Sequence, residues 1–142
     1  MIISKKVEFS ASHICRSAEL SDEENERVYG AAANPLSHGH NYVVEVVVGG
    51  EVDAVTGMVC DLGALDECVR REVVERFDYS NLNFDTAFEK RPPTTENLNI
   101  EIYTVLRAAF TQAEIVEVRV EETAKNSFAY PVGSGDGKAV AV

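Results

Sequence analysis

The sequence predicts an α+β fold, an antiparallel four-stranded sheet with two helices on one face. Segments typical of strands gather in two runs, one at each end of the chain, and two helical patterns lie between them. Strands and helices segregated in this way favour an antiparallel sheet over the alternating units of a parallel one. A chain of 142 residues can bury one continuous core. Residues 1–132 are therefore interpreted as a single domain.

Two strands are predicted in the first third of the chain. The segment "IISKKVEFSAS", residues 2–12, alternates well enough for a strand, and "HNYVVEVVVGGEV", residues 40–52, is alternating and rich in β-branched residues. Residues 14–37 between them are polar and irregular, with a possible helical turn in "SDEENERVYG" that Gly30 closes. The segment 53–62 is interpreted as a turn that leads into a further short strand.

Two helices are predicted in the middle of the chain. Leu65, Val69 and Val73 repeat at helical spacing, which indicates a first helix from about Gly63 to Phe77. Residues 78–93 have no clear period and end in "RPP", so a loop is expected there. The stretch "TTENLNIEIYTVLRAAF" predicts a second helix, capped by one of its two leading threonines, Thr94 or Thr95.

The end of the chain predicts a hairpin followed by a tail. The segments "EIVEVRVEET", residues 114–123, and "NSFAYPV", residues 126–132, are strand-like and are separated by Ala124-Lys125. The remaining residues, 133–142, are rich in glycine. We expect them to form a flexible C-terminal tail.

Composition excludes several classes of function. A net charge of -11 argues against nucleic-acid binding, which favours a basic face. No apolar run approaches the roughly 18 residues of a membrane span, so no membrane partner is expected. The N-terminal residues lack the apolar core of a signal peptide. The three cysteines form no CxxC pair and are expected to be reduced thiols, which favours a cytoplasmic protein.

The three histidines of the chain stand at the edges of two predicted strands. Residues i and i+2 of a strand point to the same side, so His38 and His40 project together. His13 ends the first strand and could meet them if the two strands pair as a hairpin. Three imidazoles with a fourth position left open suit a catalytic Zn²⁺ site, although an HxH pair alone is a weak signal.

Six segments carry a family resemblance, in the order "FSASH", "LSDEENERVYG", "HGHNYVVEV", "TGMVCDLGAL", "TTEN" and "VEET". From about Val7 to Tyr130 the chain resembles 6-pyruvoyl-tetrahydropterin synthase and, more broadly, the family that includes 6-carboxy-tetrahydropterin synthase. The resemblance implies a cytoplasmic lyase of tetrahydropterin biosynthesis with a tunnelling fold. It also implies an oligomeric barrel, a homohexamer with active sites at subunit contacts, and a small-molecule pterin substrate.

The resemblance also assigns roles to single residues. The ligands of the implied Zn²⁺ are His13, His38 and His40. Glu122 in "VEET" matches the glutamate that anchors the amino-pyrimidine edge of the pterin, and a carboxylate suits that edge because it accepts two N–H bonds. The two positions that line the pterin pocket are Thr95 and Glu96, which could also serve as ordinary helix-capping residues.

Both proton-transfer positions of the family are altered. The family's cysteine, in the loop before His-Gly-His, falls at Ala32, or at Asn34 if the shorter bacterial loop is used for counting; neither residue has a thiol. The family's Asp-His pair corresponds to Asp78 and Tyr79, and a phenol is a poor base that can act as an acid or donor. Because both positions depart, natural divergence is preferred over an engineered change at Ala32.

Several interpretations of this altered site remain open. Cys15, two residues after His13, could supply a relocated thiol but is more typical of a small core residue. Glu24 and Glu26 precede the altered loop and could replace the thiol by a carboxylate. In the first interpretation, the chain is a zinc-dependent lyase that eliminates or cleaves the side chain of dihydroneopterin triphosphate or a related pterin. Alternatively, it is a non-catalytic zinc- and pterin-binding homologue, or a structural hexamer with vestigial sites.

Overall fold

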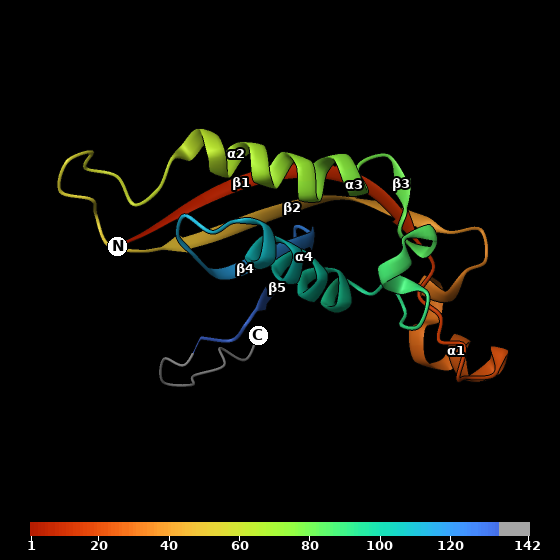
Figure 1. The fold of residues 1–142 in the computed structure, drawn as a ribbon. Coiled ribbons are helices and arrows are strands. Elements are labelled where there is room, and N and C mark those ends of the chain that lie inside the picture. Colours follow the sequence, from red (N-terminus) through yellow and green to blue (C-terminus); the bar gives the residue numbers. More distant parts are fainter. Residues whose placement is uncertain (134–142) are drawn as a thin grey trace.

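A five-stranded sheet with helices packed against one face forms the fold, so the predicted α+β class is confirmed (Figure 1). The computed structural model describes residues 1–133, and the predicted tail lies outside the described residues apart from Gly133. The strand order is β3-β1-β2-β4-β5. Among residues 1–133, no helix is both long and apolar enough to cross a membrane.

The four long strands are the predicted ones, and all their pairings are antiparallel. The two central strands, β1 (Ile2–His13) and β2 (His38–Gly49), pair along their whole length. Next to β2 lies β4 (Glu114–Thr123), which turns into β5 (Asn126–Tyr130). Strand β2 begins at His38, two residues earlier than expected, so both histidines of "HGH" lie within the sheet.

Two details of the predicted sheet are wrong. A fifth strand, β3 (Ser80–Asn81), arises in the predicted loop and runs parallel to β1. The further short strand expected within residues 53–62 does not form. The Asp53 carboxylate accepts hydrogen bonds from the backbone N–H groups of Val55 and Thr56, and the Asp53 N–H donates to the Met58 carbonyl. These bonds close the segment as a turn.

The first predicted helix forms in three parts. They are α2 (Leu62–Val69), a π-helical segment η2 (Arg70–Val74) and α3 (Glu75–Phe77). The loop after it contains two short 3₁₀ turns, η3 (Leu82–Phe84) and η4 (Thr86–Phe88).

The second predicted helix is α4 (Thr95–Ala109). Of the two candidate caps, Thr94 is the N-cap, because its side chain accepts a hydrogen bond from the Asn97 N–H. Thr95 is therefore the first residue of the helix, and its hydroxyl is not used for capping.

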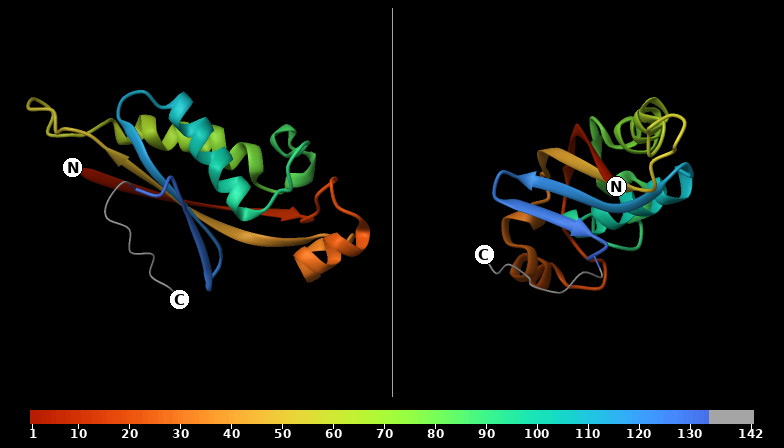
Figure 2. Two further views of the ribbon diagram at one scale, coloured as in Figure 1. Left: turned by 90° about the horizontal axis from the view of Figure 1, so that it is seen from below. Right: turned by 90° about the vertical axis from the view of Figure 1, so that its left-hand side faces the viewer.

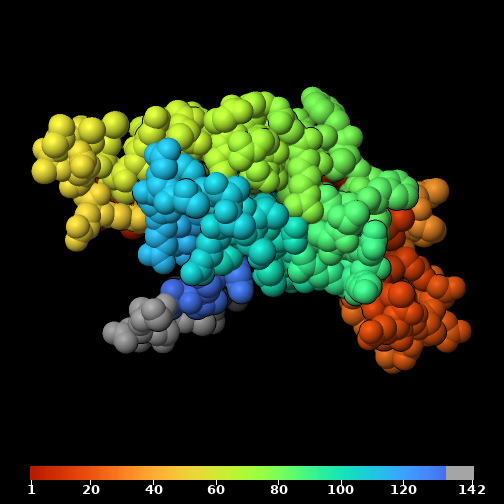
Figure 3. Space-filling view, viewed as in Figure 1, coloured from red at the N-terminus to blue at the C-terminus, as the bar shows by residue number. Residues whose placement is uncertain are grey.

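The segment between β1 and β2 is more ordered than the sequence predicts. It contains α1 (Asp22–Tyr29) and the 3₁₀ turn η1 (Gly30–Ala33). Ser21 and Glu24 form a reciprocal capping box at the start of α1. In the space-filling view this segment forms a lobe at one end of the molecule (Figure 3).

The core lies between the sheet and helices α2 and α4, which cover the same face (Figure 2). On β2 the alternate residues Tyr42, Val44, Val46 and Val48 are fully buried, and Val118 and Val120 on β4 continue this face. The period of two in the sequence thus gives the sheet one buried face. The three histidines lie on this same face, at the end of the sheet beyond Tyr42.

Candidate metal centre

Strand pairing brings the three histidines together. His13 stands directly opposite His38, and Ala11 stands opposite His40. Because cross-strand partners and residues two apart share a face, all three imidazoles project to the helix-covered side. One ligand nitrogen from each ring lies within 4.8 Å of the others. The hairpin-like pairing assumed from the sequence is therefore present.

Gly39 allows the two strands to approach closely between the histidines. A Cβ atom built at this position would lie 3.0 Å from the Ala11 carbonyl oxygen, which is tighter than nine in ten real contacts of this kind. A side chain here would require the Ala11 backbone to shift by a few tenths of an ångström. The glycine of "HGH" thus serves the spacing between the strands that carry the imidazoles.

The ring of His13 is held in one orientation and one tautomer. Its Nδ1 atom lies 2.8 Å from the carbonyl oxygen of Pro93. A carbonyl oxygen only accepts hydrogen bonds, so Nδ1 carries the proton and donates it. The lone pair is then on Nε2, which lies 3.0 Å from Nε2 of His38. A hydrogen bond from the second nitrogen of a histidine to a backbone carbonyl is typical of metal ligands.

The donor set fits a zinc ion. Two nitrogens bound to one tetrahedral zinc lie about 3.3 Å apart, close to the observed 3.0 Å between His13 and His38. Within residues 1–133, the buried atoms His38 Nδ1 and His40 Nε2 have no hydrogen-bond partner. Burial lowers the pKa of His13 and of His40 below the usual value, which favours the neutral, ligating form.

Glu122 and Thr95 adjoin this cluster. Glu122 follows Val120 by two residues on β4, so its side chain faces the helix-covered side. Its Oε1 atom lies 3.6 Å from His40 Nε2 and accepts a hydrogen bond of 2.6 Å from the Thr95 hydroxyl. Glu96, in contrast, is exposed and lines a small cavity of about 230 Å³ between α4 and β5.

Cys15 and Ala32 lie behind His13. The Cys15 sulfur is 3.9 Å from His13 Nδ1, the nitrogen turned away from the other two histidines. Burial raises the pKa of the Cys15 thiol to about 11, so it is a neutral thiol near neutral pH. The Cys15 N–H donates to the Ala32 carbonyl at 2.9 Å. Neither residue offers a thiolate on the metal side of His13.

The other two candidate replacements for the thiol are a carboxylate held in a helix cap and an exposed carboxylate. The Glu24 carboxylate accepts a hydrogen bond from the Ser21 N–H within the capping box, and this bond lowers its pKa. Glu26 is exposed on α1. Both carboxylates belong to the lobe formed by the segment between β1 and β2 (Figure 3).

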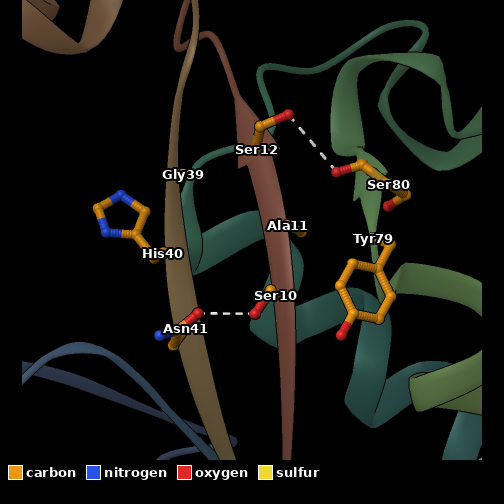
Figure 4. A pocket seen from close by; sticks show the side chains of 8 residues that line it. All are labelled: Ser10, Ala11, Ser12, Gly39, His40, Asn41, Tyr79 and Ser80. Atoms are coloured by element: carbon orange, nitrogen blue, oxygen red, sulfur yellow. Dashed lines mark hydrogen bonds between the residues drawn. The ribbon is translucent and has the colours of Figure 1, made fainter.

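Asp78 and Tyr79 are not brought to the histidines within one chain. The Asp78 carboxylate accepts hydrogen bonds from the N–H groups of Ser10 and Tyr79, at 2.9 and 3.1 Å. Tyr79 is 93% exposed and has a positive φ of 54°. It lines an open pocket of about 460 Å³ on the uncovered side of the sheet with Ser10 and Asn41. His40 also contributes to the lining of this pocket, but its imidazole points away from Tyr79 (Figure 4).

Two contributors to the site were not identified from the sequence. The Pro93 carbonyl belongs to a segment 80 residues from His13, and no sequence signal marks a backbone acceptor. Tyr42 is buried, and its hydroxyl lies 3.4 Å from His13 Nδ1. The position of Tyr42, two residues after His40 and on the same face of the strand, could have indicated this contact.

Comparisons with known proteins identify the family to which the chain is similar. The sequence model of a family described as 6-pyruvoyl tetrahydropterin synthase matches residues 2–132. The 6-pyruvoyl tetrahydrobiopterin synthase of Poecilia reticulata is 43% identical over 129 residues, which cover 90% of this chain and 88% of that protein. The Homo sapiens protein of the same name is 39% identical over 129 residues, covering 90% and 89%.

A solved structure gives the same result for the fold. The structure of Caenorhabditis elegans 6-pyruvoyl tetrahydropterin synthase is 36% identical, with a TM-score of 0.88, and the match covers 92% of this chain and 94% of that one. Sequence and fold therefore agree over nearly the whole described chain. The protein belongs to the 6-pyruvoyl tetrahydropterin synthase family.

Proposed function

We propose that this protein is a zinc-dependent lyase that eliminates or cleaves the side chain of dihydroneopterin triphosphate or a related pterin. One observation carries the proposal. Three imidazole nitrogens within 4.8 Å of one another stand beside a carboxylate that is hydrogen-bonded to a helix N-terminal threonine. This donor set combines the ligands that zinc prefers with an acceptor that suits a guanidine-like ring edge.

Each residue of the site has a proposed role. His13, His38 and His40 hold the metal, and the Pro93 carbonyl fixes the ring of His13. Glu122 accepts the N–H groups of the pterin, and Thr95 orients that carboxylate through its hydrogen bond of 2.6 Å. When bound, zinc acts as a Lewis acid that makes a hydroxyl group of the substrate side chain more acidic.

The proton carriers are the altered part of the proposal. Ala32 has no ionisable group, so a base that acts at carbon is missing on that side. Tyr79 is proposed to act as a proton donor beside the Asp78 carboxylate, and the exposed Tyr79 would reach a metal centre only across a contact between subunits. A homohexamer with interfacial active sites meets this requirement. Loss of a general base costs about 10² to 10⁴ in rate, so elimination should be slow relative to cleavage that needs no such base.

The test is a product analysis. Zinc-loaded protein is incubated with dihydroneopterin triphosphate, and the pyruvoyl and hydroxymethyl pterin products are quantified by chromatography with fluorescence detection. We expect a hydroxymethyl product that disappears when a chelator removes the metal. Protein with bound zinc that forms neither product would contradict the lyase proposal.

A second candidate function is a non-catalytic zinc- and pterin-binding homologue. The observations that favour it are the missing thiol at Ala32 and the buried, neutral Cys15 that does not replace it. It predicts measurable pterin affinity, which the Glu122→Ala substitution abolishes, and no product. Purified protein that contains no zinc would instead indicate a vestigial site.

A further inference from the structure

The two strands that carry the histidines are not joined by a tight turn. His13 is the last residue of β1 and His38 the first residue of β2, and they form the terminal pair of the ladder. The connection between them is residues 14–37, which form the lobe of Figure 3. A short hairpin loop fixes the spacing of the strand ends that it joins, whereas a long connection does not. The positions of His13 and His38 therefore depend on other contacts at the end of the ladder.

Ser37, the residue just before β2, supplies such a contact. Its hydroxyl donates to the carbonyl oxygen of His13 at 3.2 Å and shares this bond with the carbonyl oxygen of His38, at 3.4 Å. The bond therefore joins the terminal pair of the ladder. The Nε2 atoms of the two histidines lie 3.0 Å apart, and the atoms of a functional site must be held to within about 0.5 Å. A small displacement of either strand end would thus disturb the metal position.

The backbone of Ser37 is held in a conformation that serine rarely adopts. Its φ is 68°, in the left-handed region where every residue other than glycine is strained to some degree. The turn before it maintains this conformation, because the Ser37 N–H donates to the Asn34 carbonyl at 3.0 Å and the Leu36 N–H donates to the Asn34 side chain at 2.9 Å. Glycine would relieve the strain but has no hydroxyl. Strained residues cluster at functional sites, and here the strained residue carries the hydroxyl that joins the strand ends.

Other bonds hold the loop before Ser37 in place. The Ala32 carbonyl accepts a hydrogen bond of 2.9 Å from the Cys15 N–H, and the Ala33 carbonyl accepts one of 3.3 Å from the Arg16 guanidinium. These bonds join residues of the lobe to one another, outside the two strands. The bond of Ser37, in contrast, ends on the backbone of two proposed metal ligands.

We propose that Ser37 is a positioning residue of the metal centre, and that its hydroxyl sets the spacing between His13 and His38. This inference rests on the zinc site of the proposed function. Ser37 acts through the backbone of the two histidines and is not itself a ligand. Its hydroxyl and its backbone strain have opposite effects on stability, so they can be separated by substitution. Loss of the hydroxyl should change metal affinity and geometry even where the metal-free fold is not weakened.

The test compares two substitutions at Ser37 with the wild type. Ser37→Ala removes the hydroxyl and keeps the strain, whereas Ser37→Gly removes both. Ser4→Ala is the matched control, because Ser4 is exposed near the other end of β1. Competition with a chromophoric chelator gives the affinities for Co²⁺ and Zn²⁺, and the visible absorption of Co²⁺ reports the geometry of its ligands. Urea unfolding of the chelator-treated proteins gives the stability of the metal-free fold.

We expect both Ser37 variants to bind Co²⁺ about tenfold or more weakly, with altered spectra, and Ser4→Ala to match the wild type. Because glycine relieves the strain, metal-free Ser37→Gly should unfold at a higher urea concentration than Ser37→Ala, yet bind metal no better. Wild-type affinity and spectrum in Ser37→Gly, or affinities that only follow the unfolding midpoints, would overturn the inference and leave the metal centre standing. Wild-type protein that takes up neither Co²⁺ nor Zn²⁺ would instead refute the proposed function.

Discussion

His13 Nδ1 lies 2.8 Å from the carbonyl oxygen of Pro93, a contact that joins the end of β1 to the residue just before the N-cap of α4. The bond leaves Nε2 of His13 free to face the other two histidines. The start of helix α4 therefore supports the candidate site in two ways. The Pro93 carbonyl before the helix holds the ring of His13, and the first helical residue, Thr95, donates a hydrogen bond to Glu122. The proposed metal ligands and the proposed anchor both depend on the start of this helix.

Weakening that helix start should weaken metal binding. Asn97 donates a side-chain hydrogen bond of 2.8 Å to the Pro92 carbonyl and so helps to hold the Pro92-Pro93 segment. Asn97→Ala is expected to reduce zinc affinity by about tenfold, as loss of a supporting partner of a metal site typically does. Competition with a chromophoric chelator measures this. The exposed Asn126→Ala is the control, and equal affinities in the two variants would refute the role of Asn97.

Loss of the Thr95 hydroxyl should weaken pterin binding. Thr95→Val keeps the shape of a buried side chain but removes the donor to Glu122. A hydrogen bond to a charged group contributes about 1.5–3 kcal/mol, so the dissociation constant for neopterin should rise at least tenfold (about 1.4 kcal/mol). Fluorescence titration gives the constant. Thr95→Ser should retain affinity, as should the exposed Thr104→Val; unchanged binding in Thr95→Val would contradict the anchor role.

The metal-free protein should lose stability on mild acidification. Burial lowers the pKa of His13 and His40 below 6.5 in the folded state, so the unfolded chain binds more protons as the pH falls below that value. The free energy of unfolding should be highest above pH 6.5 and decrease below it. Urea unfolding of chelator-treated protein between about pH 7.5 and about pH 5.5 spans the histidine range and stays above that of carboxylates. A midpoint that is constant across this range would contradict the expectation.

Cys15 should not react with thiol reagents in the folded protein. Its thiol is buried, with a pKa raised to about 11, and all three cysteines are buried and free. Ellman's reagent is expected to label none of them at mildly alkaline pH until denaturant is added. Cys15→Ala should leave the product distribution unchanged. Rapid labelling of Cys15 that blocks turnover would instead identify it as the relocated thiol.

Sequence patterns predicted the parts of the fold that depend on repeated side chains. The alternation in β2 fixes which residues face the core, and from it follows the shared side of His38 and His40. The pairing of His13 with His38 could only be assumed, because register depends on contacts between distant strands. Strand β3, of two residues, is too short to leave a pattern. The wrong strand within 53–62 reflects side-chain bonds of Asp53 that favour a turn.

The candidate site likewise contains some features that the sequence predicts and others that it does not. Residue types and spacing indicated the three candidate metal ligands, whereas the positions of Tyr79 and Cys15 relative to them required coordinates. Tyr79 stands in a left-handed conformation on the uncovered side of the sheet. Cys15 shares a side with His13 but contacts the nitrogen that faces away from the metal position. Neither placement follows from a periodic pattern.

The central claim is that this chain retains a metal-and-anchor site and lacks only its proton carriers. The most direct measurement is the rate at which the zinc-loaded double variant Ala32→Cys, Tyr79→His forms the pyruvoyl product, under reducing conditions because Cys15 lies beside residue 32. We predict a rate about 10² to 10⁴ times that of the wild type. A double variant that binds zinc and neopterin yet shows no increase would contradict the claim.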